Sequence, residues 1–248
     1  MNFSGQPFRD IMASNNASNL QNNQDLVAEP VSLQPKVKLT DIAYQKLEQA
    51  ITMLVLEPGC SVSEQQLCEL TEIGRTPVRE AVQRLAREHL IIVLPQRGLF
   101  IPEINIRKQL KLLEARREVE RLVCRMSAKR CTDQERLAFV QLHKQFKESA
   151  RLADVDQFLK ADRMLNELTL KAARNEFAEG AMRLMHGLSR RFWYFYFKKS
   201  NDLETMALLH ANVAEAIGQR DADRAAQASD KLLDYIEFYT KESVSDFM

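Results

Sequence analysis

One eight-residue segment, Gly74-Arg75-Thr76-Pro77-Val78-Arg79-Glu80-Ala81, constrains the fold of this chain more than any other part of the sequence. Thr76 is a good N-cap, and Pro77 suits the first helical position because the N–H that proline lacks would have no partner there. Apolar side chains then recur at the spacing of one helix face, at Val78, Val82 and Leu85. The segment therefore predicts a helix that buries one side.

Two arginines stand at the start of this predicted helix. Arg75 lies just before it, and Arg79 lies one turn in. A helix N-terminus with exposed N–H groups suits a phosphate, and the planar guanidinium fork can grip O6 and N7 of guanine. The second helix of a helix-turn-helix enters the major groove with its N-terminal residues leading. The segment therefore indicates a DNA-recognition helix.

Two helices and a hairpin are predicted around it. The first helix has Thr40 or Asp41 as its N-cap and stops at a Pro-Gly breaker pair, and the second opens with a capping box formed by Ser63 and Gln66. After the recognition helix come two β-favouring runs on either side of a basic turn, namely 90–94, 99–101 and Pro95-Gln96-Arg97-Gly98. This order predicts a winged helix-turn-helix over residues 37–105.

The remaining residues, 106–243, are predicted to be helical throughout. A second capping box, Thr132 with Glu135, opens one of these helices. The residues placed to cap later helices are Asp154, Asn201 or Asp202, and Asp221. The six expected helices span residues 107–129, 132–153, 155–174, 176–198, 203–220 and 222–242. Short loops favour an antiparallel bundle, so the expected fold class is mainly α, with the winged domain followed by an all-α bundle.

Composition bounds the function. Residues 1–36 are rich in Asn, Gln and Ser and are expected to form a flexible arm. A net charge of +1 over 248 residues argues against a purely charge-driven binder of nucleic acid. From Lys38 to Glu103 there are seven basic and nine acidic residues, so DNA binding must depend on where Arg75, Arg79 and Arg97 point.

The four cysteines lack zinc-site spacing and are expected to be buried free thiols. With no signal peptide and no apolar run near ~18 residues, we expect a cytoplasmic protein with no membrane partner.

The stretch from Leu56 to Glu103 resembles the DNA-binding domain of the GntR superfamily of bacterial regulators. It carries the family pattern of Leu-x-Pro-Gly, then Ser-Glu, then Arg-Thr-Pro-Val-Arg-Glu-Ala, then a wing ending in Arg-Gly. The resemblance implies that operator DNA is contacted by Gln65, Arg75, Thr76, Arg79, Arg97 and Gly98. One departure is Gly74, which stands where the family has a serine and removes a hydroxyl that could reach phosphate. Glu72 nearby adds repulsion, so operator preference or affinity is expected to be atypical.

The C-terminal half resembles the FCD ligand-binding domain of the FadR subfamily, in its shorter VanR-like form. The residues that carry this likeness are 114–120, 156–162 with Leu165-Asn166, 173–175, and His210 with 216–221. The resemblance implies a domain that senses a small metabolite and dimerises. Arg116 stands where the family often uses an arginine for a carboxylate, a role that suits its fork geometry. The alternative for Arg116 is an intrahelical pair with Glu120 that faces solvent.

In that family one metal ion is bound by an Asp, by a His four residues later, and by one His on each of the last two helices. The corresponding positions here are Asp162, Asn166, His210 and Leu232. Neutral imidazoles suit zinc and similar metals, and two of the three are replaced. No metal or other cofactor is therefore expected, although a divalent metal stays the alternative. The expected effector pocket consists of Arg116, Asp162, Asn166 and His210, with Leu232 favouring a carboxylate that has an apolar part.

A run of six aromatic residues, 192–197, follows Arg190-Arg191. Six consecutive aromatic side chains on a helix cannot all face one core, so some must meet the ligand cavity or a partner subunit. A simple buried helix is the competing interpretation.

These features together predict a sequence-specific, DNA-binding transcription regulator controlled by a small organic acid. A two-fold operator needs a two-fold protein, so a homodimer on a short inverted repeat is expected. One alternative is a ligand-independent dimer whose helical half serves only to dimerise. A helical enzyme with a fused winged helix is the other, and it is disfavoured because the chain shows no Gly-rich phosphate loop and no nucleophile constellation.

Overall fold

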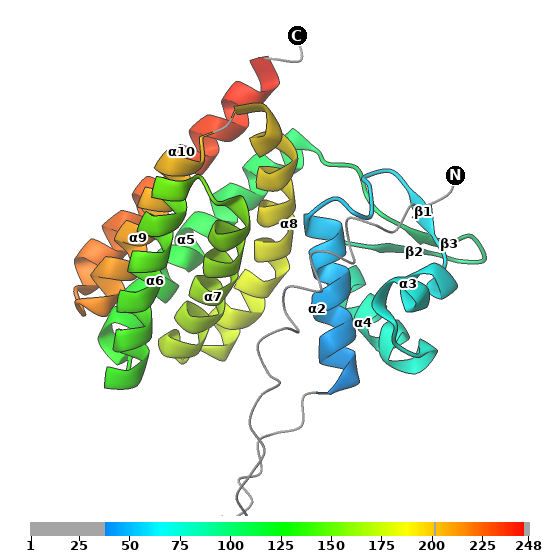
Figure 1. Cartoon of the computed structure of the whole chain (residues 1–248), viewed down its shortest axis with the longest axis horizontal. Helices are drawn as coiled ribbons and strands as arrows, with labels where there is room; N and C mark the ends of the chain where they lie inside the picture. The colour runs from blue at the N-terminus through cyan, green and yellow to red at the C-terminus, as the bar shows by residue number, and fades with distance from the viewer. Residues whose placement is uncertain (1–37, 201, 246–248) are drawn as a thin grey trace, which may run out of the picture.

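The computed structural model describes residues 38–200 and 202–245, and it shows two packed units joined side by side (Figure 1). The arm expected over residues 1–36 lies outside the described residues. Within these described residues, the N-terminal unit contains three helices and a small sheet, and the C-terminal unit contains six long helices. The predicted fold class, a winged helix-turn-helix followed by a helical bundle, is confirmed.

The N-terminal unit is built from short elements around one apolar cluster. Its helices are α2 (Leu39–Thr52), α3 (Glu64–Thr71) and α4 (Arg75–Arg87). Its strands are β1 (Ser61–Val62), β2 (Ile92–Leu94) and β3 (Gly98–Phe100), which form an antiparallel sheet in the order β1-β3-β2. The cluster at the centre includes Leu47, Ile51, Leu67, Val78 and Leu85, all fully buried. The same residues that recur at helical spacing in the sequence therefore pack α2, α3 and α4 together.

Two predicted caps in this unit are wrong. Helix α4 begins at Arg75, and its N-cap is Gly74, which has the extended backbone typical of that position and no side-chain hydrogen bond. Thr76 and Pro77 are therefore already inside the first turn, where the missing proline N–H still needs no partner. Helix α2 is capped by Lys38 without a side-chain bond. The Thr40 hydroxyl instead donates to Glu80 on α4, at 2.6 Å.

The wing carries a third strand that the sequence did not indicate. Strand β1 has only two residues and pairs Val62 with Leu99, so no alternation of apolar and polar residues could be recognised. The turn between β2 and β3 depends on Gly98, whose φ of +88° favours glycine and whose added Cβ would lie 3.4 Å from the Val62 carbonyl oxygen. The capping box of Ser63 and Gln66, by contrast, forms as predicted.

The C-terminal unit is a bundle of six helices. Their bounds are α5 (Ile106–Arg130), α6 (Asp133–Leu152), α7 (Val155–Ala173), α8 (Glu176–Ser200), α9 (Leu203–Gly218) and α10 (Ala222–Ser245). The predicted cap residues Thr132, Asp154, Asp202 and Asp221 each accept a backbone N–H at a helix start. All four cysteines are free; Cys124 and Cys131 are buried, whereas Cys60 and Cys68 are half-buried. Among the described residues, no helix is both long and apolar enough to cross a membrane.

The two units meet where α8 packs against α2 (Figure 1). Gly187 on α8 faces Leu90, and a Cβ at Gly187 would lie only 2.7 Å from the Leu90 Cδ1 atom. Glycine therefore lets the backbone of α8 approach the N-terminal unit closely. Leu188 also packs against the N-terminal apolar cluster, so α8 belongs in part to both cores.

Candidate functional site

The predicted DNA-reading residues lie on α3, on the first turns of α4 and in the wing of the N-terminal unit. Arg75 and Thr76 occupy the first turn of α4 and are exposed. Arg97 and Gly98 are exposed at the tip of the hairpin between β2 and β3. An exposed helix N-terminus beside a basic wing is the arrangement with which winged helices meet a major groove and its adjacent backbone.

Arg79 has a partner that the sequence did not indicate. Its Nε atom lies 2.8 Å from a carboxylate oxygen of Glu64 at the start of α3; the Arg79 side chain is largely exposed and that of Glu64 is half-buried. Gln65 is similarly occupied, because its amide donates to Glu69 at 3.0 Å. Both predicted DNA-reading side chains therefore already have an acidic partner on α3.

The predicted effector residues of the helical unit converge on a second site. Asp162 and Asn166 lie one turn apart on α7, and the Asn166 amide donates to Asp162 Oδ1 at 3.2 Å. His210 from α9 approaches the same Oδ1 with its Nε2 at 3.4 Å. Together with Arg116 from α5, these residues line a small cavity of about 40 Å³, which we call the inner cavity. That volume holds a water molecule or two.

A cation already faces the buried carboxylate of this cavity. Asp162 is 8% exposed, and its second oxygen accepts a hydrogen bond from Arg190 Nε on α8 at 3.0 Å. Burial alone would raise the pKa of Asp162, but the hydrogen bond from His210 and the charge of Arg190 outweigh it and hold the pKa well below its usual range. Asp162 is therefore a permanent anion at neutral pH.

His210 is oriented from both sides. Its Nδ1 lies 2.8 Å from the carbonyl oxygen of Met206, one turn earlier on α9. These two contacts fix the imidazole at both of its ring nitrogens. The rings of Phe146 and Phe158 pack against it. This setting holds the imidazole rigidly toward Asp162.

Arg116 forms the intrahelical pair that was the alternative interpretation. Its Nε lies 2.5 Å from Glu120, but both side chains are buried rather than solvent-facing as expected. Leu232 on α10 is also buried, and with Asn166 and His210 it lines a neighbouring void of about 10 Å³. The four positions inferred from family spacing therefore lie around one region of the bundle.

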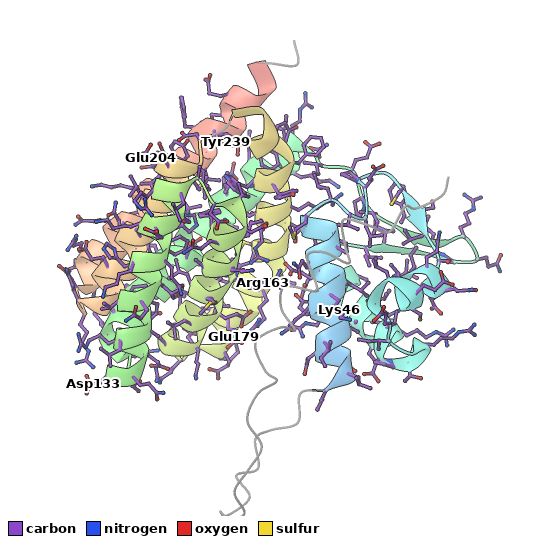
Figure 2. The ribbon with its side chains drawn as sticks, viewed as in Figure 1. Lys46, Asp133, Arg163, Glu179, Glu204 and Tyr239 are labelled. Carbon is purple, nitrogen blue, oxygen red and sulfur yellow. The ribbon has the colours of Figure 1, made fainter. Side chains whose placement is uncertain are left out.

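The inner cavity is linked to the N-terminal unit through Arg190. The guanidinium that holds Asp162 also binds Glu48 on α2, a carboxylate that is 5% exposed. Arg163, which follows Asp162 on α7 and points toward α2 in Figure 2, binds the other Glu48 oxygen at 2.8 Å. One turn earlier on α2, the Tyr44 hydroxyl donates to Glu88 just after α4, at 2.7 Å. Polar contacts thus join the cavity to α2 through Glu48, and a separate hydrogen bond joins α2 to the residue after α4.

Comparison with known proteins agrees with this architecture. Residues 39–101 match the family of bacterial regulatory proteins named gntR, and residues 111–235, half of the chain, match the FCD domain. The chain is a GntR-family transcriptional regulator. Its domain pair places it in the FadR subfamily, and this family consists of regulators rather than enzymes.

Individual relatives of this GntR regulator are distant in sequence. The HTH-type transcriptional repressor RspR of Escherichia coli is 24% identical over 196 residues, which cover 79% of this chain and 86% of RspR. The solved structure of E. coli McbR/YncC has a TM-score of 0.70 at 18% identity and covers 84% of this chain and all of that one. A GntR regulator from Rhodococcus sp. RHA1 has a TM-score of 0.61 at 19% identity, covering 82% and 97%. These structures share the fold.

The residues of this GntR regulator do not fit the metal-ligand set that the family resemblance implies. Leu232 offers no donor atom, and Asn166 offers a neutral amide. The Oδ2 oxygen of Asp162 faces the Arg190 cation, where a metal would meet like charge. Within 38–200 and 202–245, no group of three or more His, Cys, Asp or Glu side chains is arranged to hold a metal ion.

Elemental analysis tests this expectation. Protein purified without chelator or affinity-tag metal should carry well under one zinc, nickel or manganese ion per chain, because half of the family's ligands are replaced. One bound ion per chain that is lost in Asp162→Ala would contradict the interpretation.

Several site residues of this GntR regulator were missed by sequence reasoning. Arg190 was noticed only as the start of an aromatic run, and Glu48 and Glu64 were not singled out. His186 and Ser189 line the inner cavity from α8. Burial and the charges of nearby arginines hold the pKa of His186 well below its usual range, so this ring is neutral. The spacing of four residues between His186 and Arg190 was the signal available, because it places both on one helix face.

Proposed function

We propose that this regulator binds operator DNA as a homodimer and that a small organic acid entering the inner cavity changes its operator affinity. The observation that carries the proposal is the position of Arg190, which binds Asp162 in the cavity and Glu48 on α2 at the same time. A ligand that competes for this guanidinium alters the contact between the two domains. Differential contacts of this kind are what a coupling between two sites requires.

The size of the cavity supports a displacement mechanism. A cavity of about 40 Å³ is far below the ~300 Å³ typical of sites for small organic ligands. Entry of an organic acid therefore requires the surrounding side chains to move, and Arg190 is the long side chain at the wall nearest α2. The Ser189 hydroxyl, which is buried and has no hydrogen-bond partner among the described residues, is available to an incoming oxygen. A carboxylate would find Arg116 and His210 in the same wall.

The effector is tested with the natural fluorophore of the chain. Trp193 is the only tryptophan in the sequence and lines the inner cavity. Among carboxylates from acetate to 3-phenylpropionate, those with an apolar part should change Trp193 emission and shift operator affinity by about fivefold or more, the lower range of known couplings. Arg116→Gln should abolish the emission change, whereas Lys111→Gln, which removes an exposed charge from the same helix, should not.

If no carboxylate changes emission, thermal midpoint or operator affinity, the ligand-independent dimer is the better account of the helical half.

Dimerisation is tested by sedimentation. We expect the helical half to form the homodimer and residues 1–36 to be dispensable, because a palindromic operator matches a two-fold protein. Large apolar side chains exposed on the bundle, among them Met164 at 54% and Phe177 at 83%, are available for such a contact. A chain starting at Val37 should sediment as a dimer at micromolar concentration. A monomer that still binds the palindrome tightly would contradict this.

A further inference from the structure

A second and much larger hollow lies between the two domains. It has a volume of about 700 Å³, within the range of sites that bind small organic ligands. Its walls come from the C-terminal part of α4, from β2 of the wing, from the linker that follows β3, and from α5 and α8 of the bundle. We call it the junction cleft. It is distinct from the inner cavity, with which it shares no lining residue.

A buried cation lines this cleft, and the described residues give it no counter-ion. Arg191 on α8 is 2% exposed. One of its terminal nitrogens donates to the carbonyl oxygen of Pro102, and its Nε has no hydrogen-bond partner in the part of the chain that the structure describes. No described carboxylate forms an ion pair with it, and burial lowers its pKa to about 10. A buried, unpaired charge destabilises the folded state. An anion bound beside Arg191 would remove this cost.

A second unsatisfied hydrogen-bond donor lines the same cleft. Gln109 on α5 is 4% exposed, and its amide nitrogen has no hydrogen-bond partner among the described residues. Buried polar groups of folded proteins are nearly always hydrogen-bonded. Gln109 and Arg191 thus line the same cleft from neighbouring helices, each with an unsatisfied N–H group. A carboxylate accepts hydrogen bonds from donors of this kind.

The rest of the lining is suited to an apolar group. Large apolar side chains in the cleft wall are Ile92, Val93, Ile104, Leu112, Leu188 and Phe192. Ile92 and Val93 are 43% and 44% exposed, although they belong to a strand. An apolar ligand that covered these side chains would remove their surface from water, which favours binding. The nearby charges Glu103 and Lys108 also line the cleft, one of each sign, and leave Arg191 as the uncompensated group.

We propose that the junction cleft binds an organic anion, whose carboxylate is held by Arg191 and Gln109 and whose apolar body lies against the wing strand and Phe192. This site goes beyond the effector site proposed above and does not depend on it. Because the cleft has walls from both domains, a ligand here would tie the wing to the bundle.

The test uses 4-phenylbutyrate and its neutral amide, titrated by calorimetry into the full chain. The acid should bind, and Arg191→Gln should weaken its binding by about tenfold to a hundredfold, the value of a charge-assisted hydrogen bond. The amide should bind more weakly and be nearly insensitive to this change. Arg191→Lys should restore part of the affinity. The matched control is Arg107→Gln, which removes an exposed arginine from the first turn of α5, near Gln109. This variant should leave binding of the acid unchanged.

A second variant separates binding from structure. Arg191→Met replaces the unpaired charge by an apolar side chain of similar length, so the thermal midpoint should be unchanged or raised while binding of the acid is lost. A lowered midpoint would show that Arg191 serves the fold through Pro102 and would overturn the proposal.

Two other outcomes would also overturn it. These are the absence of acid binding up to about 10 mM, beyond the weak end of specific affinities, and unchanged binding in Arg191→Gln. If Arg116→Gln abolishes binding of the acid and Arg191→Gln does not, the ligand belongs to the inner cavity. That result would refute the junction site and leave the proposed effector site standing.

Discussion

Replacing Glu48 by glutamine should lower the free energy of unfolding by about 3 kcal/mol, the usual cost of removing one partner from a buried ion pair. Glu48 is 5% exposed and binds two arginines from different helices of the bundle. Glutamine keeps the shape and one acceptor oxygen but leaves Arg190 with only Asp162 as its counter-charge. The substitution weakens the contact between α2 and the bundle, because Arg163 and Arg190 both reach from the bundle to Glu48 on α2.

Thermal or denaturant unfolding measures this effect. The matched control is Glu167→Gln, since Glu167 pairs with Arg183 on the surface at 59% exposure and should change stability by less than about 1 kcal/mol. Effector binding should survive in Glu48→Gln while its influence on operator affinity is weakened. A variant as stable as the control, with undiminished effector response, would show that the contact between Glu48 and Arg190 does not couple the domains.

Operator binding should fall steeply when the first turn of α4 loses its arginines. Arg75→Ala and Arg79→Ala should each cost about 1–3 kcal/mol, because a bidentate grip on a base contributes that much. Each should also relax preference at one base pair. Both side chains are exposed at the helix N-terminus. Arg79 must first leave Glu64, so its net contribution is expected at the lower end of that range.

Gel-shift titration against the inverted repeat, at two salt concentrations, provides the measurement. Arg87→Ala is the matched control, because Arg87 is exposed in the last turn of the same helix, away from the N-terminal end that leads into the groove. Unchanged operator affinity in both first-turn variants would refute the assignment of α4 as the recognition helix.

Local sequence signals determined most of the elements. Apolar spacing and capping boxes such as Thr132 with Glu135 act within a few residues, so the helices and the hairpin could be predicted from the chain alone. The predictions that failed in the N-terminal unit also depended on local features. Gly74 caps α4 although glycine has no capping side chain, and β1 is too short to show a pattern. The likeness of the motif around Arg75 and Arg79 to a known family indicated the function, and the comparisons confirmed the family.

The sequence placed Asp162, Asn166 and His210 near one another through family spacing, and the fold brings them together. Only the tertiary structure determined which charged groups pair with these residues. Glu48 and Arg190 are 142 residues apart, and nothing in the sequence around either one records the other. The cost of burying a charge depends on what lies within a few ångströms after folding. That is why Arg190 and its neighbour Arg191 have opposite surroundings that only the folded chain distinguishes. Arg190 pairs with two carboxylates, whereas Arg191 pairs with none among residues 38–200 and 202–245.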